Sequence, residues 1–170
     1  AEFDGAGDYV DVGNLVSHSS DSYTVSLWLK ADGLGHTAYP GIISNNGWTG
    51  FNIHTETTGK LYVGTDSGDR IATSAGYITT GSWIHLVLTL EDNVGHKLYK
   101  NGVETHNNAN HPASTWGSTE ISGVTRWDGS IDEVLIFNRT LSASEIATLY
   151  NKGRDIDYFA DDNLVSWWGF

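Results

Sequence analysis

Short runs in which apolar and polar residues alternate dominate the chain up to about residue 140. Successive side chains of a β-strand point to opposite faces, so such runs are typical of strands with one buried face. We predict strands over residues 8–12, 23–31, 41–44, 51–56, 60–65, 83–90, 97–100, 103–106 and 130–138. Their close spacing, the 20 glycines and the lack of helical periodicity before Ser142 indicate an all-β sandwich.

The turns between these runs are less uniform. Asn101-Gly102 joins two short strand patterns and predicts a two-residue hairpin, because Asn and Gly tolerate the positive φ that a type I′ turn requires. Residues 107–119, by contrast, read as a long polar loop. We therefore expect one tight hairpin followed by a long loop.

The run at residues 130–138 is apolar on both faces, so both of its sides must be covered. We expect one face to carry Ile131, Leu135 and Phe137 and the other to carry Val134 and Ile136. The covering element for one side is the segment that follows.

A capped helix is predicted at residues 143–152. Ser142 and Glu145 have the spacing of a capping box, and Gly153 stands where a left-handed residue would end the helix. Ile146, Leu149 and Tyr150 form one apolar stripe. The strand and the helix together suggest a helix lying on the outside of a sheet.

Composition indicates a single domain over residues 1–170. A chain of 170 residues with 39% hydrophobic residues can build one substantial core, and it has no cysteine for a disulfide scaffold. No apolar run approaches the roughly 20 residues that span a bilayer. We expect no membrane insertion.

The charge balance restricts the partners. The 9 Lys and Arg residues against 21 Asp and Glu residues give a net charge of -12, which disfavours nucleic acid and anionic membranes. Cations and neutral glycans fit better, although acidity by itself also serves solubility.

Several motifs resemble the laminin-G-like, pentraxin-type branch of the concanavalin A-like lectin and glucanase superfamily. In chain order they are FDGAGDYVDVG (3–13), SLWLKA (26–31), SWIHLVLTL (82–90), KLYKNGVE (97–104) and DGSIDEVLIFNRTLSASEIATLYNKG (128–153). The resemblance implies a jelly-roll sandwich of two antiparallel sheets with one short helix. It implies a function only broadly, because the family contains lectins, enzyme modules, adhesion domains and spacers.

One segment departs from the family's order. A strand resembling LVSWWGF normally comes first in related chains, whereas here it occupies residues 164–170. It can close its own sandwich as in a circular permutation, be donated to a neighbouring copy, or open a further repeat. A sandwich without this strand would expose an unpaired edge, so we expect it to be paired.

The resemblance also implies a structural calcium ion. In related sandwiches it lies between the opening motif and the aspartate of GSIDEV, which makes Asp4, Gly7, Asp8 and Asp132 the candidate ligands. Calcium takes six to eight oxygen ligands, and loops rich in Asp and Gly supply them. Alternatively, the side chains of Asp4 and Asp8 accept hydrogen bonds from the backbone of their own turns, as aspartate commonly does.

Aromatic residues in loops are the candidates for sugar binding, because saccharides stack their C–H faces on aromatic rings while polar side chains bind the hydroxyls. Tryptophans within strand patterns read as packing residues instead. The candidate surface consists of Trp48, Trp116, Trp127, Asn45, Asn46 and Tyr39. The three tryptophans would otherwise plug the ends of the sandwich.

Catalysis is not expected. The seven histidines show no HxH or HExxH spacing, and no strand carries the closely spaced carboxylates of retaining glucanases. A serine nucleophile has no GxSxG motif. We do not expect an enzyme, and a glycoside hydrolase or lyase is the least favoured alternative.

The sequence therefore favours an extracellular or cell-surface module, stabilised by calcium, that binds a glycan or another surface or matrix ligand in adhesion. The second hypothesis is a structural subunit that forms a homo-oligomer or filament by donating residues 164–170 to a neighbour.

Overall fold

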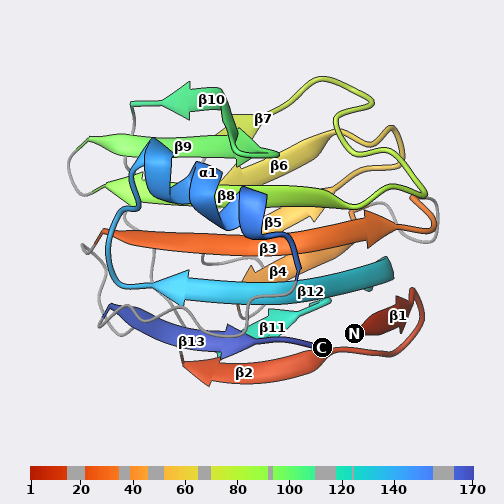
Figure 1. Ribbon diagram of the computed structural model, residues 1–170. Helices are drawn as coiled ribbons and strands as arrows, with labels where there is room; N and C mark the ends of the chain where they lie inside the picture. The colour runs from red at the N-terminus through yellow and green to blue at the C-terminus, as the bar shows by residue number, and fades with distance from the viewer. Residues whose placement is uncertain are drawn as a thin grey trace.

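Two antiparallel β-sheets pack face to face, and a helix lies on the outer side of one of them (Figure 1). The computed structural model describes residues 1–14, 22–34, 39–45, 52–64, 70–91, 94–109, 118–123, 125–154 and 163–170. This architecture confirms the predicted all-β sandwich with one short helix after it. In the described part of the chain, no helix is long and apolar enough to cross a membrane.

The sheet that carries the helix is here called sheet A. Its strand order is β1-β12-β3-β8-β9-β10, and β13 also pairs with β12. The strands are β1 (Glu2–Asp4), β3 (Tyr23–Ala31), β8 (Ile84–Glu91), β9 (Gly95–Lys100), β10 (Val103–Asn108), β12 (Asp128–Phe137) and β13 (Leu164–Trp168). The bounds of β3 match the prediction residue for residue.

The opposite sheet, sheet B, has the order β2-β11-β4-β5-β6-β7. Its strands are β2 (Val10–Asn14), β4 (Gly41–Asn45), β5 (Asn52–Thr55), β6 (Leu61–Gly64), β7 (Arg70–Ala72) and β11 (Ser118–Ile121). The sequence analysis missed β1, β7 and β11, and β11 begins inside the expected polar loop. These are short strands of three or four residues, in which alternation is too brief to recognise.

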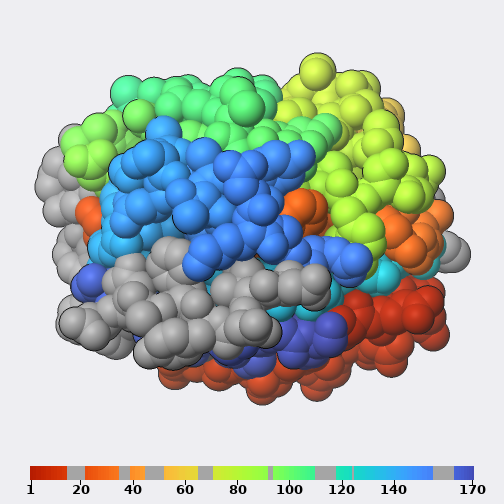
Figure 2. Space-filling model, viewed as in Figure 1, coloured from red at the N-terminus to blue at the C-terminus, as the bar shows by residue number. Residues whose placement is uncertain are grey.

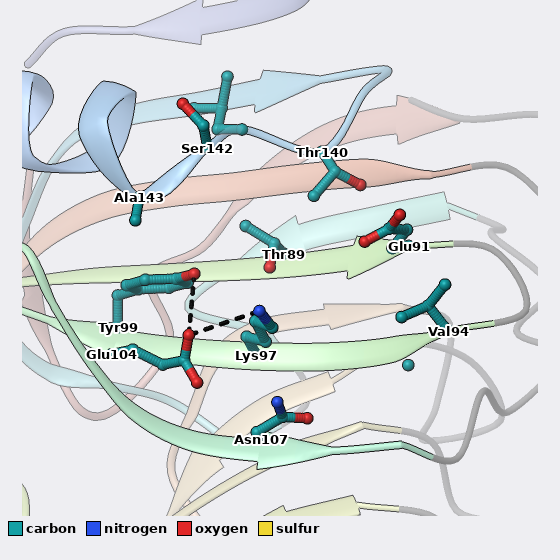
Figure 3. Close-up of a pocket in the computed structure, with 12 residues that line it drawn as sticks. Thr89, Glu91, Val94, Lys97, Tyr99, Glu104, Asn107, Thr140, Ser142 and Ala143 are labelled. Carbon is teal, nitrogen blue, oxygen red and sulfur yellow. Dashed lines mark hydrogen bonds and ion pairs between the residues drawn. The ribbon is translucent and has the colours of Figure 1, made fainter.

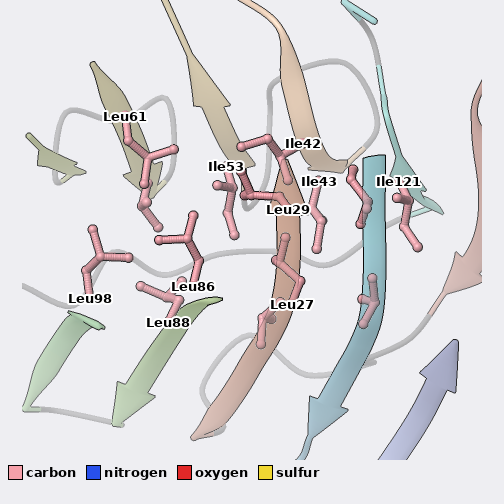
Figure 4. Packing of buried hydrophobic residues seen from close by; sticks show 14 of the residues in the cluster. Leu27, Leu29, Ile42, Ile43, Ile53, Leu61, Leu86, Leu88, Leu98 and Ile121 are labelled. Carbon is pink, nitrogen blue, oxygen red and sulfur yellow. The ribbon is translucent and has the colours of Figure 1, made fainter. Parts of the chain in front are cut away.

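The core fills the space between the two sheets (Figure 4). Many inward-facing side chains from both sheets are at most 2% exposed, among them Leu27, Leu29, Ile42, Ile43, Ile53, Leu61, Leu86, Leu88, Leu98 and Ile121. Burying each such side chain contributes roughly 1.5–3 kcal/mol relative to exposure. The alternating pattern thus supplies one continuous apolar layer.

Strand β12 is buried on both faces, as predicted, but the residues are divided between the two faces in a different way. Ile131, Val134 and Ile136 lie in the core, whereas Leu135 and Phe137 lie on the outer side. The pairing with β3 shifts register between Asp132 and Leu135, and Glu133 between them has a left-handed φ of 47°. This β-bulge adds a residue, so Ile131 faces the core instead of sharing a face with Leu135 and Phe137.

Helix α1 (Ala143–Lys152) covers the outer face of sheet A (Figure 2). Ile146 and Leu149 pack on Leu135 and Phe137 in a second apolar cluster. The predicted capping box is present, because the Ser142 hydroxyl accepts from the Glu145 N–H and the Glu145 carboxylate accepts from the Ser142 N–H. The predicted stop at Gly153 is also confirmed, with a φ of 74°.

Strands β13 and β1 lie one after the other along the same edge of β12 (Figure 1). β13 pairs with residues 134–137 and β1 with residues 128–130. The two chain ends meet between them, where the Ala1 amino group donates to the Ile131 carbonyl over 2.7 Å. The segment 164–170 thus pairs within its own chain in this structure, while the assembly state stays a prediction.

Candidate functional site

The four predicted calcium ligands do not come together. Asp4 pairs with Asp128 across β1 and β12, and Asp132 lies four residues further along β12, about 13 Å away at roughly 3.3 Å per residue. The Asp132 carboxylate is instead held by protein groups: it accepts from the N–H of Phe170 over 2.9 Å and lies 3.7 Å from Arg154. The backbone therefore separates Asp132 from Asp4, and calcium binding by the predicted residues stays a prediction.

Asp4 and Asp8 belong to a separate acidic hollow. This hollow is lined by Glu2, Phe3, Asp4, Asp8, Asp32 and Asp128. The Asp4 carboxylate accepts the N–H of Ala6 over 2.8 Å, which is the turn role considered as the alternative for this residue. A Cβ added at Gly7, in the same turn, would meet no atom within 4 Å. Across the ranges that the structure describes, no group of three or more His, Asp or Glu side chains is placed to hold a metal ion.

The residues predicted to form a sugar-binding loop surface are also placed differently from the prediction. Trp127 is wrong as a surface residue, because its ring is fully buried in the core between the sheets. It stands at the entry to β12, so the large ring fills the end of the sandwich, the alternative considered for the loop tryptophans. Trp48, Trp116 and Asn46 lie outside the described residues. Asn45 ends β4, and Tyr39 precedes the start of that strand.

Tyr39 instead belongs to a row of rings on the outer side of sheet B. The ring centroids of Tyr39 and His54 are 5.8 Å apart and perpendicular, and those of His54 and Tyr62 are 5.2 Å apart and stacked. His54 on β5 and Tyr62 on β6 are direct cross-strand partners, so the alternation that buries Ile53 and Val63 turns these two rings outward. The row is therefore a direct product of strand pairing.

Charged and polar groups flank this row. The Lys60 amine lies 4.8 Å above the Tyr62 ring, and the Tyr62 hydroxyl donates to Glu56 over 3.4 Å. The other Glu56 oxygen accepts from Thr58 over 2.8 Å. These contacts fix the carboxylate and the amine beside the rings, where they can bind hydroxyl groups of a ligand.

A further tyrosine lies on the same side of sheet B, at its β2 edge. The Arg126 guanidinium stacks 4.5 Å from the Tyr9 ring and lies 3.7 Å from the Glu120 carboxylate. Thr125 links this group to the row, because its hydroxyl donates to the Tyr39 carbonyl. Tyr9 and Tyr39 are 49% and 48% exposed.

We call the surface formed by Tyr9, Tyr39, His54 and Tyr62, with Lys60 and Arg126, the outer aromatic face. Tyr9 and Tyr39 are about half exposed, Tyr62 is half-buried and His54 is buried, so the tyrosines are the ring faces that a ligand can reach. The sequence analysis found only Tyr39 of these residues. His54 and Tyr62 stand at alternate positions to core residues in predicted strands, so the strand pattern placed them on the outer side, but only pairing brings them together.

Comparisons with known proteins agree with this fold. The family model for the concanavalin A-like lectin/glucanases superfamily matches residues 4–147. Among solved structures, the chain is similar to domain 4 of AbnA, a GH43 extracellular arabinanase from Geobacillus stearothermophilus, in complex with arabinotriose. The identity is 28%, the match covers 81% of this chain and 69% of that chain, and the TM-score is 0.61.

Two more distant structures share the fold. A protein from Bacteroides ovatus, provisionally described as carbohydrate binding, is 14% identical over 99% of this chain and 50% of its own, with a TM-score of 0.75. The heptameric SAP-like pentraxin of Limulus polyphemus is 16% identical over 98% of this chain and 86% of its own, with a TM-score of 0.69. Comparison with curated protein sequences gives no match.

Proposed function

Because the chain belongs to the concanavalin A-like lectin/glucanase superfamily, we propose that it is a non-catalytic module that binds neutral carbohydrate on its outer aromatic face. The observation that carries this proposal is the row of Tyr39, His54 and Tyr62, with Tyr39 about half exposed. Sugars present C–H faces that stack on such rings, and the flanking Lys60 and Glu56 can bind their hydroxyls.

The similarity to an arabinanase domain in complex with arabinotriose supports this proposal and suggests a first ligand to test. In our proposal the module works outside the cell, in adhesion or as part of a glycan-degrading system. Binding to an open face of this kind is shallow, so affinity would come from several such contacts along a polymer.

The test is calorimetric titration with arabinotriose and with a panel of other neutral oligosaccharides. Tyr39→Ala should weaken binding about tenfold or more, because it removes an exposed stacking ring. Tyr39→Phe keeps the ring and should bind nearly as well as the parent. Val103→Ala, which truncates an exposed side chain on the other sheet, sheet A, serves as the control.

The proposal is wrong if no oligosaccharide binds, or if binding occurs and Tyr39→Ala and Tyr62→Ala both leave it unchanged. In the second case the sugar site would lie elsewhere on the sandwich.

Assembly through the terminal strand is the second candidate function. Within residues 164–170, Val165, Trp167 and Phe170 are 39%, 39% and 50% exposed, which favours a role in contacts between copies. The solution mass from light scattering distinguishes a monomeric module from a subunit that assembles through this strand. We expect a monomer of 18.5 kDa in calcium and in chelator, because β13 pairs within its own chain. Polymers that a peptide of residues 164–170 caps would instead identify a structural subunit.

Calcium binding stays a prediction. Its test belongs at the acidic hollow, where Asp4 and Asp8 of the predicted ligand set lie. Calcium should raise the melting temperature of the parent and raise it less in Asp8→Asn. An equal effect on both proteins would remove the hollow from the proposal.

A further inference from the structure

A second polar site lies on the opposite side of the sandwich from the outer aromatic face. It is a pocket of about 260 Å³ on the outer face of sheet A, between strands β8 to β10 and the segment that leads into α1. Figure 3 shows side chains from β9 and β10 on its floor and Thr140, Ser142 and Ala143 along its far wall.

Strand register builds the floor from two cross-strand rows. Thr89 on β8, Lys97 on β9 and Asn107 on β10 are successive partners and form a row of polar side chains. In the adjacent row, Tyr99 on β9 faces Glu104 on β10. Partners directly opposite each other on one face are close enough to interact.

A β-bulge makes this floor possible. Glu104 and Asn107 are three residues apart, so in a regular strand they would face opposite sides of the sheet. The pairing of β10 with β9 shifts register between Glu104 and His106. The extra residue turns both Glu104 and Asn107 toward the pocket, which is a common use of bulges near functional sites.

The donors and acceptors in the pocket are held in place by one another. The Glu104 carboxylate accepts from the Tyr99 hydroxyl over 3.3 Å and lies 3.5 Å from the Lys97 amine (Figure 3). Burial, together with the neighbouring Glu104, raises the pKa of Tyr99, so the phenol stays a neutral donor. The carboxylates of Glu91 and Glu104, an amine and an amide thus line one small cavity.

The size and the mixed chemistry restrict the ligand. A volume of about 260 Å³ is just below the roughly 300–1,000 Å³ of sites for drug-sized molecules, so one small ring fits better than an extended chain. The lining contains both donors and acceptors and includes the apolar Val94 and Leu141. A polyhydroxylated ring presents both hydroxyl groups and C–H faces, which match this lining.

We propose that this pocket, here called the sheet A pocket, binds a single neutral sugar or polyol unit, with Glu104 accepting from and Lys97 and Asn107 donating to its hydroxyls. The proposal goes beyond the outer aromatic face and stands whether or not that face binds carbohydrate. With both sites filled, the module would hold two glycan chains on opposite faces.

The experiment is titration of the isotope-labelled protein with methyl glycosides of arabinose, galactose and glucose, followed by amide chemical shifts. At least one glycoside should shift the amides of Thr89, Lys97, Tyr99 and Asn107. Glu104→Ala and, independently, Lys97→Met should each weaken this binding about tenfold or more. Tyr39→Ala should leave it unchanged, which separates the two sites.

Glu120→Gln, which removes a carboxylate on sheet B, is the matched control and should not alter the shifts in the sheet A pocket. The proposal is overturned if none of the three glycosides shifts these amides at millimolar concentration. It is overturned equally if the shifts persist in both Glu104→Ala and Lys97→Met.

Discussion

The two outer faces of the sandwich are built on similar inner layers but are covered in different ways. The outer face of sheet A under α1 is apolar, with Val87, Leu135 and Phe137 each no more than 1% exposed. The outer face of sheet B carries His54 and Tyr62 at the corresponding alternate positions. The residues on the outward positions thus differ in character, being apolar under the helix and aromatic or polar on sheet B.

The rings on the two faces differ accordingly in their surroundings. Under the helix, the ring of His85 lies tilted against that of Trp28 with centroids 5.1 Å apart, and Tyr150 of α1 stacks on Trp28 at 5.7 Å. Burial lowers the pKa of His85 to about 4. On sheet B, the row that ends in Tyr39 is open to solvent at that residue. Ring contacts are therefore largely buried on one face, whereas on the other they extend to a residue that is about half exposed.

The largest effect is expected from truncation under the helix. Phe137→Ala removes a fully buried ring between β12 and α1 and should lower the free energy of unfolding by about 3–5 kcal/mol. Tyr62→Ala on the open face should cost only about 1 kcal/mol, mainly from the lost ring stacking. Urea unfolding of both variants measures the difference. Equal losses would mean that the two faces contribute similarly to stability.

Acid should weaken the helix-covered face. Folded His85 has a pKa of about 4 against 6.5 for the exposed side chain, so the unfolded chain takes up the proton first. Its contribution to stability is complete above pH 6.5 and is lost as the pH falls toward about 4, by roughly 3 kcal/mol in total. Unfolding measured across this range should show the loss in the parent.

His85→Gln is the control for this pH dependence. It should be less stable than the parent at neutral pH and should lose less stability on acidification. A parent and variant with the same slope would show that other groups cause the acid sensitivity.

A moderate effect is expected at the edge of sheet A. Asp132→Ala removes an acceptor of two backbone N–H groups, from Glu133 and Phe170, and should cost about 1–2 kcal/mol. Because these partners are protein groups, the loss should be the same in calcium and in chelator. Melting curves in both media test this expectation, and a loss confined to calcium would restore Asp132 as a metal ligand.

The smallest effect on stability is expected at Tyr39. Its ring is 48% exposed, so Tyr39→Ala should change the free energy of unfolding by less than about 0.5 kcal/mol while it weakens carbohydrate binding. Thermal unfolding measured beside the titrations separates the two consequences. A large loss of stability would place Tyr39 among the packing residues instead.

Local signals predicted much of the fold. β3, the hairpin at Asn101-Gly102 and the capped helix at residues 143–152 appear where the sequence placed them. Each depends on the preferences of a few neighbouring residues, such as the positive φ at Asn101 and the reciprocal bonds of Ser142 and Glu145. Such preferences do not require knowledge of distant contacts.

The candidate sites were harder to predict. Trp127 follows polar loop residues and looked exposed, yet it fills the core. Asp4 and Asp132 looked like one ligand set, but strand pairing separates them along β12. Both differences arise because a linear pattern gives the environment along the chain, while burial and proximity depend on partners far away in sequence.

The sequence alone determined the periodicity of the strands, the position of the helix and the acidity of the surface, because these follow from neighbouring residues and composition. Tertiary structure decided the registers: the bulge at Glu133 that turns Ile131 inward, the bulge that brings Glu104 and Asn107 to one pocket, and the pairing of His54 with Tyr62. A shift of one residue moves a side chain to the other face of a sheet. Since the partner strand sets that shift, the function of these faces is fixed only when the strands pair.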